Sequence, residues 1–278
     1  MSTLLDSIKQ IAIAAGEEIL AVYNDSQPID VTVKDDNSPL TQADRRANAL
    51  IVEQLIGYDP AIPILSEENE QPDFSERQKW QRYWLVDPLD GTKEFISRNG
   101  EFTVNIALIE KGEPVLGIVH VPVSGTTYFG GTACAGAWKQ SQHEGSAAPQ
   151  ALAVSRITDS EAPLRVVASR NHRGELVDRL IQQARSHFHN VEVVSMGSSL
   201  KLCLLAEGSA DIYPRLAPTS EWDTAAAHAV LRAAGGDVLT TEFAALRYNQ
   251  KETILNPHFI AIADNNFDWS ALLAPSLG

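Results

Sequence analysis

The chain has 278 residues, of which 44% are hydrophobic and 21% are charged, as in ordinary globular proteins and unlike disordered or fibrous ones. Its formal net charge is −14, and no block of Lys and Arg interrupts this acidic character. Such a surface repels phosphates at long range, so we expect no nucleic acid polymer as a partner. A small anionic ligand stays compatible with this charge if metal ions reverse the local field.

The cysteines and the apolar runs bear on compartment and membrane contact. Cys134 and Cys203 are the only cysteines and neither belongs to a CxxC pair, so we expect two reduced thiols and a cytoplasmic protein. No basic flank precedes the apolar residues of the first ten, and no apolar run approaches the roughly 20 residues of a membrane helix. We therefore expect neither a signal peptide nor a transmembrane segment.

The first ninety residues predict two helices and three short strands. Apolar residues at helical spacing predict a helix over 4–23, and VTV predicts a strand at 31–33. Thr41 then opens a second helix. The apolar run at 62–65 and the strand expected at 83–86 are both followed by carboxylates, and this pattern recurs in the motifs described below.

The rest of the chain changes character near residue 150. Apolar runs at 103–109 and 115–121 flank EKGE and predict a hairpin, to which 126–129 adds a third antiparallel strand. Residues 140–150 are polar and small, which predicts a surface loop. Beyond them strands alternate with helices: strands near 165–169, 191–194, 211–213 and 259–263, helices near 174–187, 198–206 and 222–234.

This order of elements predicts a layered α/β (α+β) sandwich with two subdomains. Residues 1–150 would form an α+β subdomain that carries most of the acidic residues. Residues 151–278 would form an α/β subdomain that adds Asp223. No internal repeat and no low-complexity tract interrupts the sequence.

Carboxylates recur directly after apolar strands or at helix starts. They are Asp44, Glu67, Glu68, Asp87, Asp90 and Asp223. Taken singly, each has an ordinary explanation: a helix cap, a solvated loop, a turn or a first-turn residue. If they converge, a hard cation such as Mg²⁺ is the simplest way to hold them together, because such ions prefer carboxylate oxygens.

The stretch DPLDGT at 87–92 suits a metal and phosphate site. Pro88 bends the chain, Gly91 lets the backbone approach a ligand closely, and Thr92 begins a short helix. The carbonyl of Leu89 lies between the two aspartates. Patterns of the Walker A, GxGxxG and calcium-loop types are absent from the sequence, which argues against a P-loop NTPase, a Rossmann dehydrogenase and an EF-hand.

Three stretches in a fixed order resemble the signature of the inositol monophosphatase superfamily. They are LSEE at 65–68, WLVDPLDGT at 84–92 and EWDTAAAHAV at 221–230. Further stretches narrow the resemblance to its bacterial 3′(2′),5′-bisphosphate nucleotidases of the CysQ type: DDNSPLTQADRRA, RNGEFTVNIALI, SRNH, GSSLKLCLLAEG, IYPR and LNP. The resemblance covers residues 4–263 and implies a layered αβαβα sandwich of the sugar-phosphatase type.

The resemblance implies a ligand set for Mg²⁺, with two or three ions in each site. One ion would bind Glu67, Asp87 and the Leu89 carbonyl, and a second would bind Asp87, Asp90 and Asp223. It further implies that Asp44 and Thr92 activate the attacking water, with Glu67 close by.

Substrate contacts also follow from the resemblance, not from spacing. The implied substrate-binding residues are Leu89, Asp90, Gly91, Thr92, His172, Gly197, Ser198, Lys201, Arg215 and Asp223. Lys201 and Arg215 would pair with a second, non-reacting phosphate. The sequence departs from many relatives at Glu221, before Trp222, and we expect this change to leave Asp223 undisturbed. His228 is expected to be packed or at the surface, not catalytic.

These residues suggest a Mg²⁺-dependent phosphomonoesterase. It would remove the 3′-phosphate of adenosine 3′,5′-bisphosphate, or of its 5′-phosphosulfate form, to give AMP and phosphate by metal-activated water attack. An inositol or sugar monophosphatase of the same fold is one alternative, and a non-catalytic metal or nucleotide sensor is another. The oligomeric state stays open. So does peripheral association with the inner membrane face, although no basic amphipathic helix supports it.

Overall fold

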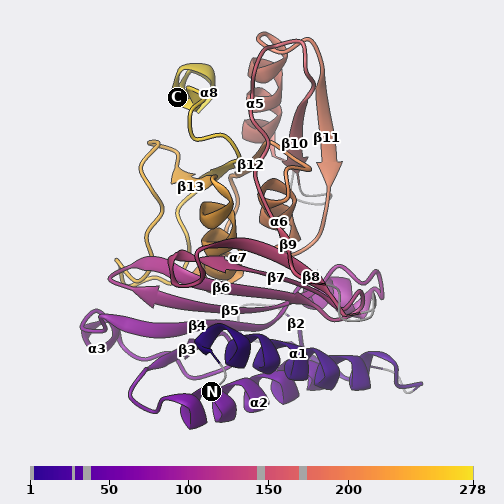
Figure 1. Cartoon of the computed structure of the whole chain (residues 1–278), viewed down its shortest axis with the longest axis vertical. Helices are drawn as coiled ribbons and strands as arrows, with labels where there is room; N and C mark the ends of the chain where they lie inside the picture. Colours follow the sequence, from indigo (N-terminus) through magenta and orange to yellow (C-terminus); the bar gives the residue numbers. More distant parts are fainter. Residues whose placement is uncertain (1–2, 27–28, 34–38, 143–147, 169–173, 278) are drawn as a thin grey trace.

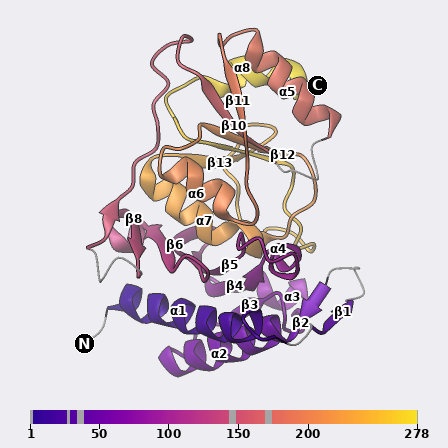
Figure 2. The same ribbon diagram turned by 90° about the vertical axis from the view of Figure 1, so that its right-hand side faces the viewer.

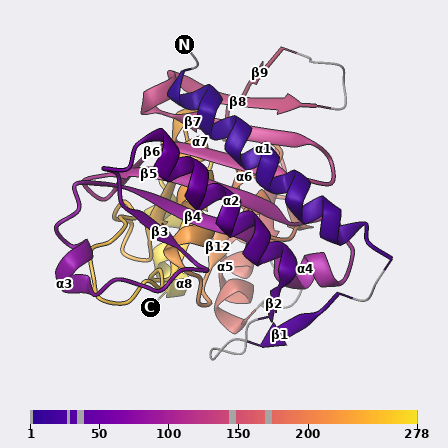
Figure 3. The same ribbon diagram turned by 90° about the horizontal axis from the view of Figure 1, so that it is seen from below.

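The computed structural model describes residues 3–26, 29–33, 39–142, 148–168 and 174–277. Helices and sheets alternate in five layers, which confirms the predicted αβαβα sandwich (Figure 1). Helices α1 (Leu4–Tyr23) and α2 (Gln42–Tyr58) form the first layer. Both lie across the outer face of a large sheet, as the view from below shows (Figure 3). The small hairpin of β1 (Val31–Val33) and β2 (Pro39–Thr41) stands beside them.

The large sheet has seven strands in sequence order. Its members are β3 (Ile64–Ser66), β4 (Arg82–Asp90), β5 (Thr103–Glu110), β6 (Glu113–Val121), β7 (Thr126–Gly131), β8 (Gly136–Ser141) and β9 (Gln150–Ala151). Among the described strands of this sheet, β3 and β4 pair in parallel and the other neighbours are antiparallel. The predicted hairpin of β5 and β6 is confirmed. The described connections between these strands include the short helices α3 (Phe74–Arg77), α4 (Thr92–Ile96) and η1 (Thr132–Cys134).

The middle helices and the small sheet come from the second half of the chain. The sheet order is β11 (Val191–Ser195), β10 (Leu164–Ala168), β12 (Ile212–Arg215), β14 (Phe259–Ile262) and β13 (Asp237–Thr240). Helices α6 (Leu200–Ala206) and α7 (Glu221–Ala234) lie between the two sheets, and α5 (Glu175–Arg185) and α8 (Trp269–Leu277) cover the far face (Figure 2).

The prediction of a surface loop over residues 140–150 is wrong at both ends of that range, where the structure has strand residues. Strand β8 continues to Ser141, and β9 begins at Gln150 and pairs with it in antiparallel fashion. These residues are polar because they lie at the open edge of the large sheet, where one strand has no outer neighbour and side chains meet water. Residues 143–147 of this stretch lie outside the described residues.

The two sheets divide the chain close to the predicted subdomain boundary. The large sheet ends with β9 at Ala151, and the small sheet begins with β10 at Leu164. Helix α7, however, packs against β5, β6 and β7 of the large sheet. The division into 1–150 and 151–278 therefore stays a prediction. None of the described helices is long and apolar enough to cross a membrane.

Close packing of α7 on the large sheet depends on small residues. A Cβ added at Gly117 of β6 would lie 2.0 Å from the Ala226 carbonyl oxygen of α7. The facing side of the helix is itself small, with Ala225, Ala226 and Ala229 fully buried. Because both surfaces lack bulk, the helix axis comes close to the sheet and the start of α7 reaches the end of β4.

Candidate active site

Two of the predicted aspartates lie where β4 ends. Its pairing with β5 shifts register between Asp87 and Asp90, so a bulge separates the two carboxylates. Asp87 is 2% exposed, and its Oδ1 accepts a hydrogen bond of 3.0 Å from the Leu89 amide. Gly91 then adopts φ 97°, a conformation that favours glycine, and α4 begins at Thr92 as predicted.

Asp44 caps a helix through one carboxylate oxygen and contacts Thr92 through the other. Its Oδ2 accepts the Thr41 amide at 2.8 Å and the Thr41 hydroxyl at 2.6 Å, which closes a capping box at the start of α2. Its Oδ1 accepts a bond of 3.2 Å from the Thr92 hydroxyl. The cap therefore fixes Asp44 so that its second oxygen faces the start of α4.

Ser199 links Asp90 at the end of β4 to Asp223 in the first turn of α7. Its amide donates to Asp90 Oδ2 at 2.6 Å, and its hydroxyl lies 2.8 Å from the same oxygen and 2.5 Å from the backbone carbonyl of Asp223. Asp223 Oδ2 in turn accepts the Ser220 amide at 2.9 Å, in a capping box that begins α7. Sequence reasoning missed Ser199, because only the folded chain brings it to β4.

Crowding of negative charge dominates the electrostatics here. Burial, and then repulsion from Glu67 and Asp90, raises the pKa of Asp87 well above its usual range; Asp223 and Asp44 add smaller contributions. Burial and Asp90 likewise raise the pKa of Asp223. The structure therefore brings Asp44, Glu67, Asp87, Asp90 and Asp223 into one electrostatic group.

The carboxylates of this acidic group are oxygen donors, and oxygen donors suit a hard cation. Asp87, Asp90 and Asp223 each bind described residues through one carboxylate oxygen: Oδ1 in Asp87 and Oδ2 in the other two. All donors of the group are oxygens, which Mg²⁺ prefers. Among the described residues, no three His, Cys, Asp or Glu side chains have the geometry of a metal site.

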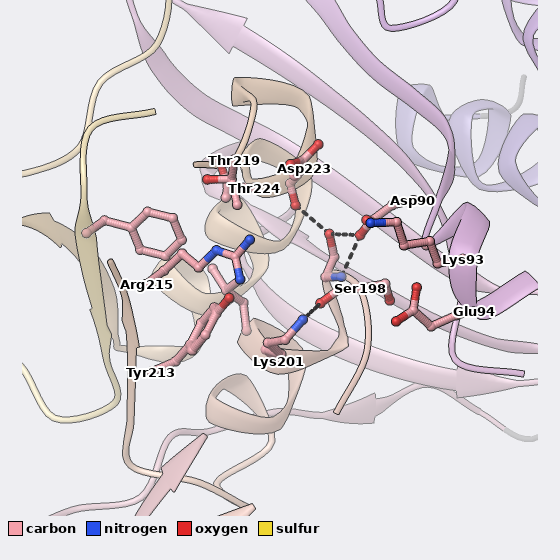
Figure 4. A pocket seen from close by; sticks show the side chains of 14 residues that line it. Asp90, Lys93, Glu94, Ser198, Lys201, Tyr213, Arg215, Thr219, Asp223 and Thr224 are labelled. Carbon is pink, nitrogen blue, oxygen red and sulfur yellow. Dashed lines mark hydrogen bonds between the residues drawn. The ribbon is translucent and has the colours of Figure 1, made fainter. Parts of the chain in front are cut away.

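A cleft with about 660 Å³ of empty space, partly open to solvent, adjoins the acidic group. Asp90 and Asp223 line it together with two predicted cations, Lys201 and Arg215 (Figure 4). Lys201 is only 9% exposed, and its ammonium donates to the Ser198 carbonyl at 2.9 Å. Burial lowers the pKa of Lys201, against the opposing effect of Asp90.

The other predicted substrate contacts have mixed outcomes. Ser198 lines the cleft with φ 44°, an uncommon backbone conformation for a residue other than glycine. The Gly197 amide, predicted as a donor to substrate, instead donates to Glu101 Oε2 at 2.7 Å, so it is engaged within the protein in this structure. His172 lies outside the described residues.

Several lining residues were not predicted. They are Lys93, Glu94, Leu202, Tyr213, Thr219, Thr224 and Phe259. Lys93 and Glu94 directly follow the DPLDGT stretch, and this position beside the motif was the available signal. The rings of Tyr213 and Phe259 meet edge to face, with centroids 5.8 Å apart. His228 is packed, as expected: it is 1% exposed and lies 2.9 Å from both Tyr248 Oη and Asp237 Oδ1.

Comparison with known proteins places this geometry in a family. The model of the Inositol monophosphatase family matches residues 1–269. The chain belongs to this family. That membership agrees with the order of the three motifs and with their convergence at the ends of β3 and β4 and the start of α7.

Within the family, the chain is similar to bacterial proteins named 3′(2′),5′-bisphosphate nucleotidase CysQ. It is 48% identical to that of Escherichia coli K12 over 259 residues, which covers 92% of this chain and 98% of the relative. It is 37% identical to that of Haemophilus influenzae over 270 residues, 97% of this chain and 96% of the relative.

Solved structures agree. The crystal structure of CysQ from Bacteroides thetaiotaomicron, called a bacterial member of the inositol monophosphatase family, matches with a TM-score of 0.79 and 43% identity over 93% of this chain and 96% of that one. An inositol monophosphatase of Thermotoga maritima matches with a TM-score of 0.74 over 99% of both chains. At 20% identity, that second likeness concerns the fold alone.

Proposed function

We propose that this protein is a Mg²⁺-dependent 3′(2′),5′-bisphosphate nucleotidase that hydrolyses adenosine 3′,5′-bisphosphate to AMP and phosphate. One observation carries the proposal: a single cleft is lined by Asp90 and Asp223 and also by Lys201 and Arg215. A substrate with two phosphates suits such a cleft, because one phosphate can react beside the carboxylates while the other binds the cations. The similarity to CysQ nucleotidases over 92% of the chain supports the same substrate.

The acidic group would hold the metal. The residues proposed to bind two or three Mg²⁺ ions are Glu67, Asp87, Asp90, Asp223 and, through its carbonyl, Leu89. When bound, the ions would offset the carboxylate charge and draw electron density from the phosphate oxygens. The raised pKa values of Asp87 and Asp223 support this assignment, since carboxylates that repel one another are stabilised by a cation.

Asp44 and Thr92 are proposed to prepare the attacking water. The Thr92 hydroxyl already donates to Asp44 Oδ1 at 3.2 Å. Thr92 can therefore accept a proton from water while its own proton moves to Asp44, which leaves hydroxide to attack the phosphorus. The bond between phosphorus and the 3′-oxygen breaks, and that oxygen takes up a proton from solvent to become the 3′-hydroxyl of AMP, while Asp44 releases its proton to solvent. The contacts proposed for Gly91, Ser198 and His172 would hold the substrate during this step.

The cations are proposed to bind the phosphate that does not react. Lys201 is buried and its hydrogen-bond acceptor is a neutral carbonyl, so an anion beside it would compensate for its loss of hydration. Arg215 donates to the Pro218 carbonyl at 3.1 Å through one nitrogen of its guanidinium. Its Nε is buried, and no described residue accepts a hydrogen bond from it. A phosphate could accept that bond.

The setting of the reaction is also a proposal. Cys134 and Cys203 are both free thiols, which suits the reducing cytoplasm. The proposed partner is a small nucleotide, in line with the acidic surface charge of −14.

Phosphate release from a panel of substrates tests the function. The panel holds adenosine 3′,5′-bisphosphate, its 5′-phosphosulfate form, inositol 1-phosphate and fructose 1,6-bisphosphate, each with Mg²⁺ and with a chelator. We expect the nucleotides to give the highest kcat/KM and the chelator to abolish turnover. Asp90→Asn is the control: it keeps an acceptor for Ser199 and loses a metal ligand, so it should fold and be inactive.

Two results would replace the proposal. Equal or faster turnover of inositol 1-phosphate would indicate a monophosphatase of the same fold. Tight binding of the nucleotide with no phosphate release in Mg²⁺ would indicate a sensor.

A further inference from the structure

A glutamate begins α7 in an unusual environment. Glu221 is the first residue of the helix and is 2% exposed, two positions before Asp223. Its Oε2 accepts a hydrogen bond of 2.8 Å from the backbone amide of Asn249. The backbone amide of Glu221 donates to the Ile254 carbonyl at 2.9 Å. Glu221 therefore binds the loop at 249–254 through both its side chain and its backbone.

The loop is held on its other side by α3. Asn249 has φ 57°, and its side-chain amide donates to the Arg77 carbonyl at 2.7 Å. Its Oδ1 accepts a hydrogen bond from Arg77 Nη1. The Asn249 side chain thus both donates a hydrogen bond to Arg77 and accepts one from it, while the Asn249 backbone amide donates to Glu221.

Arg77 is a buried cation whose hydrogen-bond acceptors are neutral. It is 2% exposed, and its Nη2 donates to the carbonyl of Glu252 and, at 3.1 Å, to that of Lys251. Its guanidinium also lies 4.8 Å from the centre of the Phe74 ring. A buried guanidinium is costly unless its donors are satisfied, so these bonds fix the loop firmly against α3.

We propose that Arg77, Asn249 and Glu221 form a brace that fixes the first turn of α7 and thereby the direction of the Asp223 carboxylate. Arg77 and Asn249 are positioning residues in this inference: they act through Glu221, more than a hundred residues from Arg77 in sequence. The inference rests on the proposed function, in which Asp223 binds Mg²⁺.

The first turn of a helix needs such support. Its amides have no partners within the helix, so it frays unless a cap or a neighbouring segment holds it. Ser220 is the capping residue, and its amide donates to the Asp223 carboxylate within the capping box. The Asp223 carboxylate therefore serves both in the cap and in its proposed role as a metal ligand. The Ile254 carbonyl and the Asn249 amide hold the turn from outside. The brace therefore keeps the turn formed when Asp223 adjusts to an ion.

Titration with Mn²⁺, followed by electron paramagnetic resonance in the absence of substrate, tests the brace directly. Arg77→Met removes the guanidinium bonds. Asn249→Gly keeps the backbone conformation and the amide to Glu221 but loses both side-chain bonds. We expect each variant to raise the Mn²⁺ dissociation constant about tenfold. KM for adenosine 3′,5′-bisphosphate at saturating Mg²⁺ should change less than twofold.

A conservative pair at Glu221 separates positioning from simple loss of structure. Glu221→Gln retains an oxygen that can accept the Asn249 amide, and Mn²⁺ affinity should stay within about twofold of the parent protein. Glu221→Ala loses the acceptor and should weaken Mn²⁺ about tenfold. If Arg77→Met fails to fold, Asn249→Gly and this pair decide the question.

The matched control is Arg165→Met. Arg165 has a side chain that is 28% exposed and is bound to Asp211 at 2.7 and 3.0 Å, and it is not among the residues that line the cleft. The Arg165→Met variant should have a lower midpoint of thermal unfolding and an unchanged Mn²⁺ affinity.

Three outcomes decide between the inferences. Parent-like Mn²⁺ affinity in folded Asn249→Gly and Glu221→Ala would overturn the brace. So would equal weakening in Arg165→Met, which would mean that general destabilisation is the cause. A parent protein that binds Mn²⁺ but releases phosphate from no bisphosphate nucleotide would overturn the proposed function and leave the brace standing.

Discussion

Lys201 is a charged side chain in a buried position, where it loses hydration. Its side chain is 9% exposed, and burial lowers the pKa of its ammonium because the charge loses hydration. Asp90, Glu94 and Asp223 partly offset that loss through their charge. Tyr213 adds a ring whose centre lies 5.7 Å from the ammonium. A residue kept charged in such a place suits the binding of an anion better than it suits stability.

We predict that Lys201→Met raises KM for adenosine 3′,5′-bisphosphate about 10- to 100-fold, or about 1.4–2.8 kcal/mol. The side-chain volume is retained and only the ammonium is lost. Steady-state phosphate release provides the measurement, with 3′-AMP as the matched substrate because it lacks the second phosphate. KM for 3′-AMP should stay within about twofold of the parent value. Equal increases for both substrates would place Lys201 at the reacting phosphate instead.

At the residue scale, motifs predicted the charged groups and missed their partners. Asp87, Asp90 and Asp223 could be singled out because each carboxylate follows an apolar run or begins a helix. Ser199 could not, since one serine in GSSLKL looks like its neighbour until α6 is placed beside β4. The engaged amide of Gly197 is another tertiary effect, because its partner Glu101 lies 96 residues earlier.

Helix α7 sets the geometry at the scale of elements. It brings Asp223 to the cleft at one end, and its small residues lie flat on the large sheet along its length. Gly117 has no tolerance for a side chain there: an added Cβ would lie 2.0 Å from the Ala226 oxygen and 2.9 Å from the Ala229 Cβ. The contact is with helix backbone, which cannot rotate away as a side-chain tip can.

Gly117→Ala should therefore destabilise the protein by about 1–3 kcal/mol, because α7 must shift off the sheet. Activity should fall as well, since the shift carries Asp223 with it. Urea unfolding and kcat/KM are the measurements. Gly57→Ala is the control: it lies in α2 with no atom within 4 Å of the added Cβ, so it should stabilise by about 0.5–1 kcal/mol. Unchanged stability in Gly117→Ala would mean that α7 lies farther from the sheet than described.

Elements with strong periodicity were predicted well. The helix at 4–23, the helix opened by Thr41 and the hairpin of β5 and β6 all carry regular apolar patterns. The short or edge elements α3, β8, β9, β13 and α8 were not predicted. Their sequences are short or polar, and they form because neighbouring elements offer hydrogen bonds and apolar surface, which no local pattern reveals.

The stability of the whole molecule depends on a histidine buried between layers. His120 of β6 is 3% exposed and lies against α1, where a Cβ added at Gly16 would be 2.6 Å from its ring. Its Nδ1 lies 2.9 Å from the Thr127 hydroxyl. Burial lowers the pKa of His120 to about 4, since a charged ring would lack water.

The contribution of His120 to the free energy of unfolding should therefore fall between about pH 6.5 and pH 4. The unfolded chain binds a proton at His120 near pH 6.5 and the folded chain does not until about pH 4, so stability is full above 6.5 and falls below it. Between pH 7 and pH 5 the loss is about 2 kcal/mol from this residue. Urea unfolding at both pH values, compared with His120→Gln, measures it. Identical losses in the two proteins would refute the assignment.

The sequence by itself determined which residues carry charge into the site, which segments are amphipathic helices or paired strands, and to which family the chain belongs. These features are local, since they depend on residue type and on spacing within one segment. Only the tertiary structure decided that Ser199 joins Asp90 to Asp223, that Gly197 is engaged by Glu101, and that Asn249 contacts both Arg77 and Glu221. Those contacts join segments far apart in the chain, and their geometry follows from how closely α7 packs between the two sheets.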